Sequence, residues 1–133
     1  MSQFGAQLHK KSGRKTAGNG KFKLKSRDKR RHESGGYFTA TKLGAAKNVS
    51  KDVRSRGGTH GKKLKSAAFA NLLTNGGYKK VKITGVAESK DNRNFARLNI
   101  ITKGTVIDTE AGQAIVINRP ARDNVVNARL MKK

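Results

Sequence analysis

The sequence lacks cysteine and tryptophan, and it has one proline and only 8 acidic residues among 133. Without cysteine there are no disulfides, thiolate zinc sites or cysteine nucleophiles, which fits a reducing compartment. Aromatic residues make up 5% of the chain, so few side chains can stack on bases. No run approaches the roughly 20 apolar residues that span a bilayer, and the N-terminus lacks the apolar segment of a signal peptide. We therefore expect a soluble, intracellular protein.

Positive charge is what the chain has in excess, with 31 Lys and Arg and a net charge of +23. Residues 1–65 hold 19 of these cations and 3 acids, a net +16, whereas residues 66–133 hold 12 and 5, a net +7. Such a chain repels itself unless a dense polyanion neutralises it. A membrane-binding segment would need an amphipathic helix with bulky apolar residues, and the basic segment is instead rich in Gly, Ser and Thr. The composition favours nucleic acid over a membrane as the partner.

Residues 1–36 are predicted to form a basic, glycine-rich arm. From residue 7 to residue 36 the only sizeable apolar side chains are Leu8, Phe22 and Leu24. They cannot offset a backbone ordering cost of about 1 to 2 kcal/mol per residue, so we expect the arm to be disordered when free and to fold on phosphates. A solubilising or targeting tail is the alternative. The expected RNA contacts are Lys10, Lys11, Arg14, Lys15, Lys21, Lys23, Lys25, Arg27, Lys29, Arg30, Arg31 and His32.

Residues 37–133 are predicted to form one mainly β domain, a small antiparallel β-barrel. Short runs rich in β-branched residues alternate with turn signals, and there is little helical periodicity. The expected strands are 37–43, 49–56, 62–66, 78–88 with a bulge at Gly85, 105–109, 113–118 and 125–130. Residues 67–73 fit a helix or a strand, and residues 91–94 form a turn that opens one helical turn through Leu98. The expected core is Val53, Leu64, Phe69, Leu72, Val81, Ile83, Val86, Ile101, Val106, Ile107, Ile115, Ile117, Val126 and Leu130.

A hairpin with the loop Gly57-Gly58-Thr59-His60-Gly61 is a second candidate RNA-binding element. The glycines are explained equally well by a plain turn or by close approach of the backbone to a phosphate. Both explanations are compatible, because a rigid hairpin tip can carry cations on its flanks. The flanking cations are Arg54, Arg56, Lys62, Lys63 and Lys65.

Residues that would support catalysis or metal binding are not grouped. His9, His32 and His60 lie in basic, glycine-rich segments without the spacing of shared ligands. The acids Glu88, Asp91, Asp108, Glu110 and Asp123 are scattered over strand ends and turns. No phosphate-binding loop, nucleophile elbow or metalloprotease helix is present. We expect no enzyme, no cofactor and no small-molecule substrate.

Several phrases of the sequence occur in the order of a known family. They are Lys29–Gly35, Thr41–Gly44, Val53–Gly58, Lys79–Ile83, Arg97–Gly104 and Val125–Ala128. In this order the chain, from about Lys10 onward, resembles the small-subunit ribosomal protein family eight of archaea and eukaryotes. Two positions depart from the family's pattern, Arg14 and Ser34. The short chain is similar to the archaeal form.

The resemblance implies a structural component of the 30S subunit that binds 16S-type ribosomal RNA through phosphate and shape contacts. It implies a β-barrel with an extended N-terminal arm, a cytoplasmic ribosome as location, and neighbouring small-subunit proteins as partners, without catalysis. It also adds Lys42 to the expected phosphate contacts. We expect no homo-oligomer. The alternatives are a separate ribosome-assembly or other RNA-binding factor and, from another class, a small nucleic-acid-processing enzyme.

Overall fold

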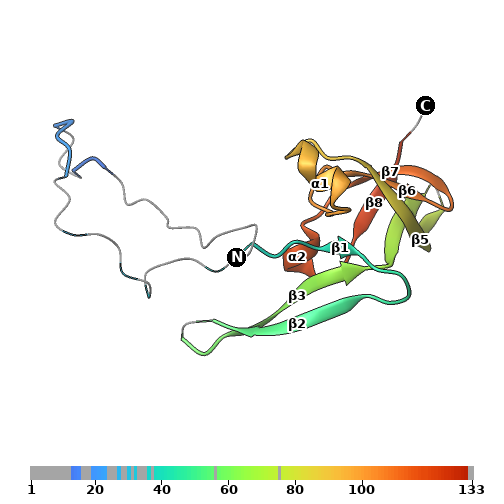
Figure 1. Ribbon diagram of the computed structural model, residues 1–133, viewed down its shortest axis with the longest axis horizontal. Coiled ribbons are helices and arrows are strands. Elements are labelled where there is room, and N and C mark those ends of the chain that lie inside the picture. Colours follow the sequence, from blue (N-terminus) through green and yellow to red (C-terminus); the bar gives the residue numbers. More distant parts are fainter. Residues whose placement is uncertain are drawn as a thin grey trace. The chain divides into compact units, whose positions relative to one another are not determined.

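The protein divides into two units, residues 1–38 and residues 39–133. The computed structural model describes residues 13–15, 19–23, 27, 30, 32, 36, 38–55, 57–74 and 76–131. Its strands and helices all belong to the second unit (Figure 1). The strands are β1 (Lys42–Leu43), β2 (Val49–Arg54), β3 (His60–Ala67), β4 (Phe69–Thr74), β5 (Gly77–Glu88), β6 (Val106–Thr109), β7 (Gly112–Val116) and β8 (Asn127–Leu130). The helices are α1 (Arg93–Arg97) and α2 (Pro120–Asp123).

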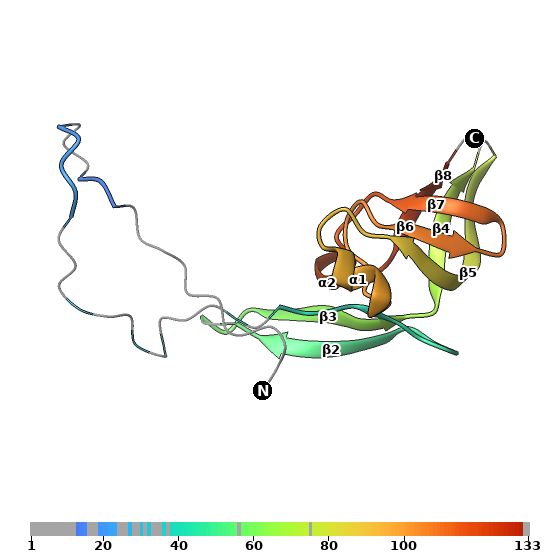
Figure 2. The same ribbon diagram turned by 45° about the horizontal axis from the view of Figure 1, so that its top comes forward.

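The second unit consists of a closed barrel and a separate small sheet. The barrel has the strand order β4-β5-β6-β7-β8, and the sheet has the order β1-β3-β2. Figures 1 and 2 both show β2 and β3 extending away from the barrel. The predicted mainly β fold with a barrel is confirmed. Two details differ from it, because β4 and β8 close the barrel as a parallel pair and the 49–66 hairpin lies outside the barrel.

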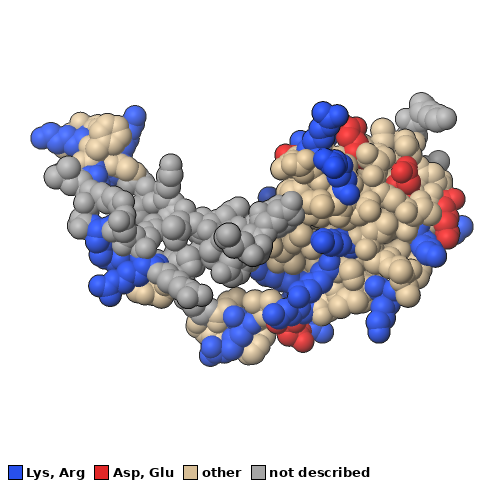
Figure 3. Space-filling view, in the orientation of Figure 1, with Lys and Arg blue, Asp and Glu red and all other residues tan. Residues whose placement is uncertain are grey.

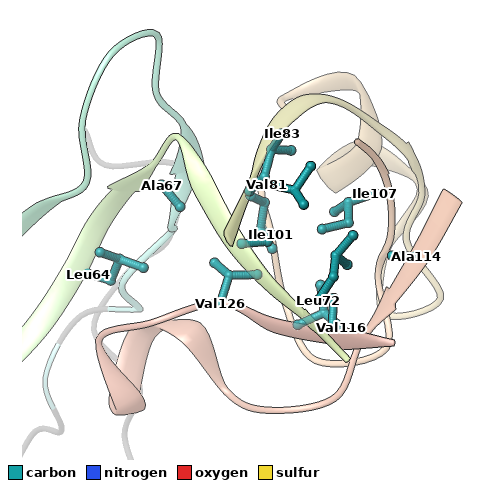
Figure 4. Close-up of a cluster of buried hydrophobic side chains, with 12 residues drawn as sticks. Leu64, Ala67, Leu72, Val81, Ile83, Ile101, Ile107, Ala114, Val116 and Val126 are labelled. Atoms are coloured by element: carbon teal, nitrogen blue, oxygen red, sulfur yellow. The ribbon is translucent and has the colours of Figure 1, made fainter. Parts of the chain in front are cut away.

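The core fills the barrel and continues under β3 (Figure 4). Leu72, Val81, Ile107 and Val116 are buried inside the barrel, on strands whose alternate residues point outward. Small residues complete the interior, because a five-stranded barrel has little room inside. These are Ala67, Ala70, Ala114 and Ala128.

The prediction for β7 was wrong by one residue. Ile115 and Ile117 were expected in the core, but Ala114 and Val116 are buried, while Ile117 is 48% exposed. Both alternating sets are apolar, so the pattern alone did not fix the face, and a shift of one residue reverses every side chain. The pairing of β7 with β6 places Ala114 opposite the buried Ile107, where the small side chain fits.

The expected strand 37–43 is also too long. Tyr37 lies outside the described residues, and β1 covers only Lys42 and Leu43. Thr41 is instead held between two other segments, because its hydroxyl donates to the Leu64 carbonyl (2.8 Å) and its carbonyl accepts from the Ile101 amide (2.8 Å). These bonds use groups that a longer strand would have paired.

The ambiguous segment 67–73 is extended, and β3 runs into β4 through a bend at Ala68. The Asn48 side chain fixes this bend, because its Oδ1 accepts from the amides of Ala68 (2.7 Å) and Phe69 (3.2 Å). Two amides that lack a strand partner at the bend are therefore satisfied. The connection between the small sheet and the barrel is thus defined by one side chain.

The bulge and the helical turn agree with the structure, but the expected loop 57–61 is shorter, because β3 begins at His60. Val53 and Phe69, expected in the core, are only half-buried. The register shifts at Gly85 as a bulge requires, α1 follows the predicted turn, and Gly112 has φ 117°. Pro120 begins the four-residue helix α2, where proline lacks only an N–H that has no helical partner. The helix ends at Asn124 in the left-handed conformation, with φ 61°.

Candidate nucleic-acid interface

The tip of the β2–β3 hairpin is a glycine turn with cations on its flanks. Gly57 and Gly58 have φ 82° and 85°, values that favour glycine. The loop is closed by a 2.7 Å hydrogen bond from the Ser55 amide to the Thr59 carbonyl. Arg54 reaches back over the tip, since a Cβ added at Gly58 would lie 3.9 Å from its Nη2. The glycines therefore serve the turn, and a cation accompanies them.

The strand pairing places like charges opposite each other. Lys51 of β2 pairs with Lys63 of β3 in antiparallel register, and Asp52 pairs with Lys62. Paired residues project from the same face of a sheet, so the two ammonium groups lie on one face. Lys51, which the sequence analysis did not select, is therefore part of this surface. Lys51 can be assigned to this surface only once the register of the hairpin is known.

We define the basic hairpin as Lys51, Arg54, Lys62, Lys63 and Lys65. Four of the five are exposed, and Lys63 is half-buried. Asp52 is the only acid between residues 39 and 67. Figure 3 shows basic atoms along the part of the surface that the small sheet forms, with little acidic surface among them. The sheet thus presents concentrated positive charge.

Two neighbouring elements add cations to the small sheet. Lys42 of β1 is exposed and pairs with Ser66 of β3. Helix α2 packs against β3, and Arg119 and Arg122, at its start and in its last turn, are exposed. No local signal in the sequence joins these arginines to the hairpin, because the contact between α2 and β3 is a property of the fold.

In the first unit, the described residues include a small loop with four cations. Arg14 and Phe22 form an antiparallel bridge, the Lys15 amide donates to the Lys21 carbonyl (2.9 Å), and the Lys23 amide donates to the Gly13 carbonyl (2.7 Å). Gly20 turns the loop with φ 69°. The exposed cations of this loop are Arg14, Lys15, Lys21 and Lys23.

The expected RNA-binding residues thus fall into two groups that belong to different units. The described members in the first unit are Arg14, Lys15, Lys21, Lys23, Arg27, Arg30 and His32, all of them exposed. Those in the second unit are Lys42, Arg54, Lys62, Lys63 and Lys65. Lys10, Lys11, Lys25, Lys29, Arg31 and Arg56 lie outside the described residues.

The described residues contain no group of three or more His, Asp or Glu side chains that could hold a metal ion. Among them, no helix has both the length and the apolar character that crossing a membrane requires. The chemical feature that indicates a function is the concentration of exposed cations.

Known proteins are similar in sequence to this chain over most of its length. It is 43% identical over 117 residues to a protein of Hyperthermus butylicus named small ribosomal subunit protein eS8, covering 86% of this chain and 85% of that protein. Proteins of the same name from Sulfolobus acidocaldarius and Saccharolobus islandicus are 42% and 46% identical, covering 84% and 85% of this chain and 88% and 86% of theirs. The model of the family described as ribosomal protein S8e matches residues 8–131. The chain therefore belongs to the ribosomal protein S8e family.

Proposed function

We propose that this protein is a structural constituent of the small ribosomal subunit, in the cytoplasmic ribosome, where its cations bind phosphates of the ribosomal RNA. Its relatives carry the name of a small-subunit protein, and nothing in that family role requires catalysis. The observation that carries the RNA contact is the pairing of Lys51 with Lys63. Like charges directly opposite in a sheet are destabilising, and a phosphate between them removes that cost.

The two groups of cations have different parts in this proposal. The basic hairpin is a surface already formed on a folded sheet, whereas the arm, residues 1–36, carries 11 of the 31 Lys and Arg and a net charge of +9. The arm orders as its cations meet phosphates, so folding and assembly are coupled. Affinity that rests on several phosphate contacts falls steeply with salt, by about 10³ to 10⁵ between 50 and 200 mM for six to ten contacts.

The proposal is tested on purified small subunits washed at moderate salt. A structural constituent stays in the washed particles at one copy per subunit, as quantitative mass spectrometry measures. Its absence from them would overturn the proposal. Substoichiometric, transient association would instead identify the alternative, an assembly or other RNA-binding factor.

A further inference from the structure

We infer that the outward face of β5, β4, β8 and β7 binds a neighbouring protein of the small subunit, one that presents apolar side chains flanked by carboxylates. The inference rests on the proposed function, because it assigns a surface to the contacts that a subunit constituent makes. This surface is separate from the basic hairpin, since it lies on the barrel and not on the β1-β3-β2 sheet.

The strand register arranges the outward residues in rows across four strands. Tyr78, Leu73, Arg129 and Ile115 are successive cross-strand partners and form the first row. The second row runs through Lys80, Asn71 and Asn127 to Ile117, whose amide donates to the Asn127 carbonyl. Lys82 and Phe69 begin a third. The residues between these positions, such as Leu72, Val81 and Ala128, are buried, so the rows face outward.

Half of the residues in these rows are apolar or aromatic. Tyr78 is 74% exposed, Ile117 48% and Leu73 37%. Val125 is 38% exposed and directly precedes Val126, whose carbonyl accepts from the Asn71 amide, so it extends the same face. Single exposed apolar residues are ordinary, but several on one face indicate an interaction site, here Tyr78 with Leu73 at one side and Ile115, Ile117 and Val125 at the other. Only 34% of the residues are hydrophobic, so placing several of them outside the core is unfavourable unless a partner covers them.

The charges of the same rows give the chemistry of the partner. Lys80, Lys82 and Arg129 are exposed, and the rows contain no acidic residue. Arg129 lies between Leu73 and Ile115 in the first row, and in the second row the Asn71 Nδ2 donates to the Asn127 Oδ1 (3.2 Å). A face on which apolar side chains and cations alternate is complementary to a surface that presents apolar side chains flanked by Asp or Glu.

Two other occupants fit the face less well. Tyr78 alone offers RNA an open ring, because Leu73, Ile115, Ile117 and Val125 have neither donors nor a π-face and Lys80 already covers the Phe69 ring at 4.8 Å. A second copy of the chain would bring equal surfaces together, so the cations of one face would meet those of the other, on molecules of net charge +23. The complementarity therefore favours a different protein.

Photo-crosslinking within assembled subunits tests the inference. Benzoyl-phenylalanine replaces Tyr78 in one full-length variant and Val125 in a second, while Val49, 42% exposed on the small sheet, carries it as the control. The barrel positions should give ribonuclease-resistant adducts with a protein, at a peptide containing Asp or Glu, that the Val49 position does not give. An adduct with RNA, with a second copy or with a basic peptide would overturn the inference, as would incorporation without any adduct.

The proposed function is judged separately, by whether the unmodified chain is present in the washed subunits. A second measurement uses the partner protein that crosslinking identifies, in purified form. The double variant L73S/I117S should bind it at least about tenfold more weakly, because two aliphatic side chains are lost from the contact, while V49S should bind it normally. Circular dichroism and the RNA affinity of L73S/I117S should be unchanged. If L73S/I117S binds that protein as tightly as the unmodified chain, the face is not the docking surface.

Discussion

The pairing of Lys51 with Lys63 predicts that removing one charge changes stability and RNA binding in opposite directions. Side chains directly opposite in an antiparallel pair have Cβ atoms about 4.5–5.5 Å apart, and such pairs contribute about 0.2–1 kcal/mol. Lys51→Gln removes this repulsion, so the free energy of unfolding of the free protein should rise by up to about 1 kcal/mol. Lys51 is exposed, so no buried contact is lost with the charge.

In the proposed complex with RNA the same change removes a phosphate contact. Each contact contributes about 0.7 to 0.9 to the slope of log affinity against log salt. Because salt rises fourfold from 50 to 200 mM, the loss of affinity over that range should become about threefold smaller in Lys51→Gln. Affinity at low salt should fall for every RNA sequence, since a phosphate contact carries no base information.

Asp52→Asn is the matched control, because Asp52 lies next to Lys51 in β2 and pairs with Lys62. Removing its carboxylate breaks an opposite-charge pair, so the free protein should lose up to about 1 kcal/mol of stability. The same change takes a negative charge away from the RNA, so affinity should rise. The two variants are thus expected to differ in sign in both assays.

Urea unfolding followed by circular dichroism measures the stability of the free, full-length variants. Titration of labelled small-subunit ribosomal RNA at several salt concentrations gives affinity and slope. A Lys51→Gln protein that is less stable than the parent would refute the repulsion across the sheet. An unchanged affinity and salt slope would show that this part of the basic hairpin does not bind phosphates.

Three further predictions concern the arm, the bend and the barrel. Deleting residues 1–36 should leave the sheets folded, as circular dichroism measures, but sharply reduce the RNA affinity and its dependence on salt. Equal RNA binding would contradict the proposal that the arm contributes to RNA affinity and is not needed for the fold. Asn48→Ala should cost about 1–3 kcal/mol in urea unfolding, because the Ala68 amide loses its acceptor in a buried position, whereas Asn48→Asp keeps an oxygen there and should cost less. Ala114→Leu should cost about 1–3 kcal/mol by overpacking the barrel, while Ile117→Ala should be nearly neutral; the reverse order would mean that the assigned face of β7 is wrong.

Much of the barrel can be predicted from local signals. The alternation in β5, the bulge at Gly85 and the tight turn at Gly112 are each encoded by a few neighbouring residues, and all three occur in the structure. The face of β7 is not encoded in this way, because alanine, valine and isoleucine alternate without a polar set. What selects Ala114 for the interior is the limited space beside Ile107, which depends on barrel closure.

The kind of candidate site could be predicted from the sequence, but not all of the residues that form it. Clusters such as Lys62-Lys63 are visible in the sequence, whereas Lys51 depends on the hairpin register and Arg122 depends on the packing of α2 against β3. The separation of the hairpin from the barrel was also missed. It follows from the bend at Ala68, where β3 ends and β4 begins. The hydrogen bonds that fix this bend are donated by the Ala68 and Phe69 amides to the Asn48 Oδ1, and they join residues 20 and 21 positions apart.

The fold also explains why cations are placed on two such different elements. A hairpin fixed by its glycine turn and by Asn48 offers phosphates a preformed surface, so little conformational entropy is lost when RNA binds. In the proposed function the arm orders on binding and loses about 1 to 2 kcal/mol of backbone entropy per residue, so each of its charge contacts must offset part of that cost. The hairpin is therefore the better element for positioning the protein, at the cost of repulsion between Lys51 and Lys63. In the same proposal the arm is the better element for neutralising charge over a long path, because a chain extended along RNA reaches phosphates that a folded domain of 95 residues cannot.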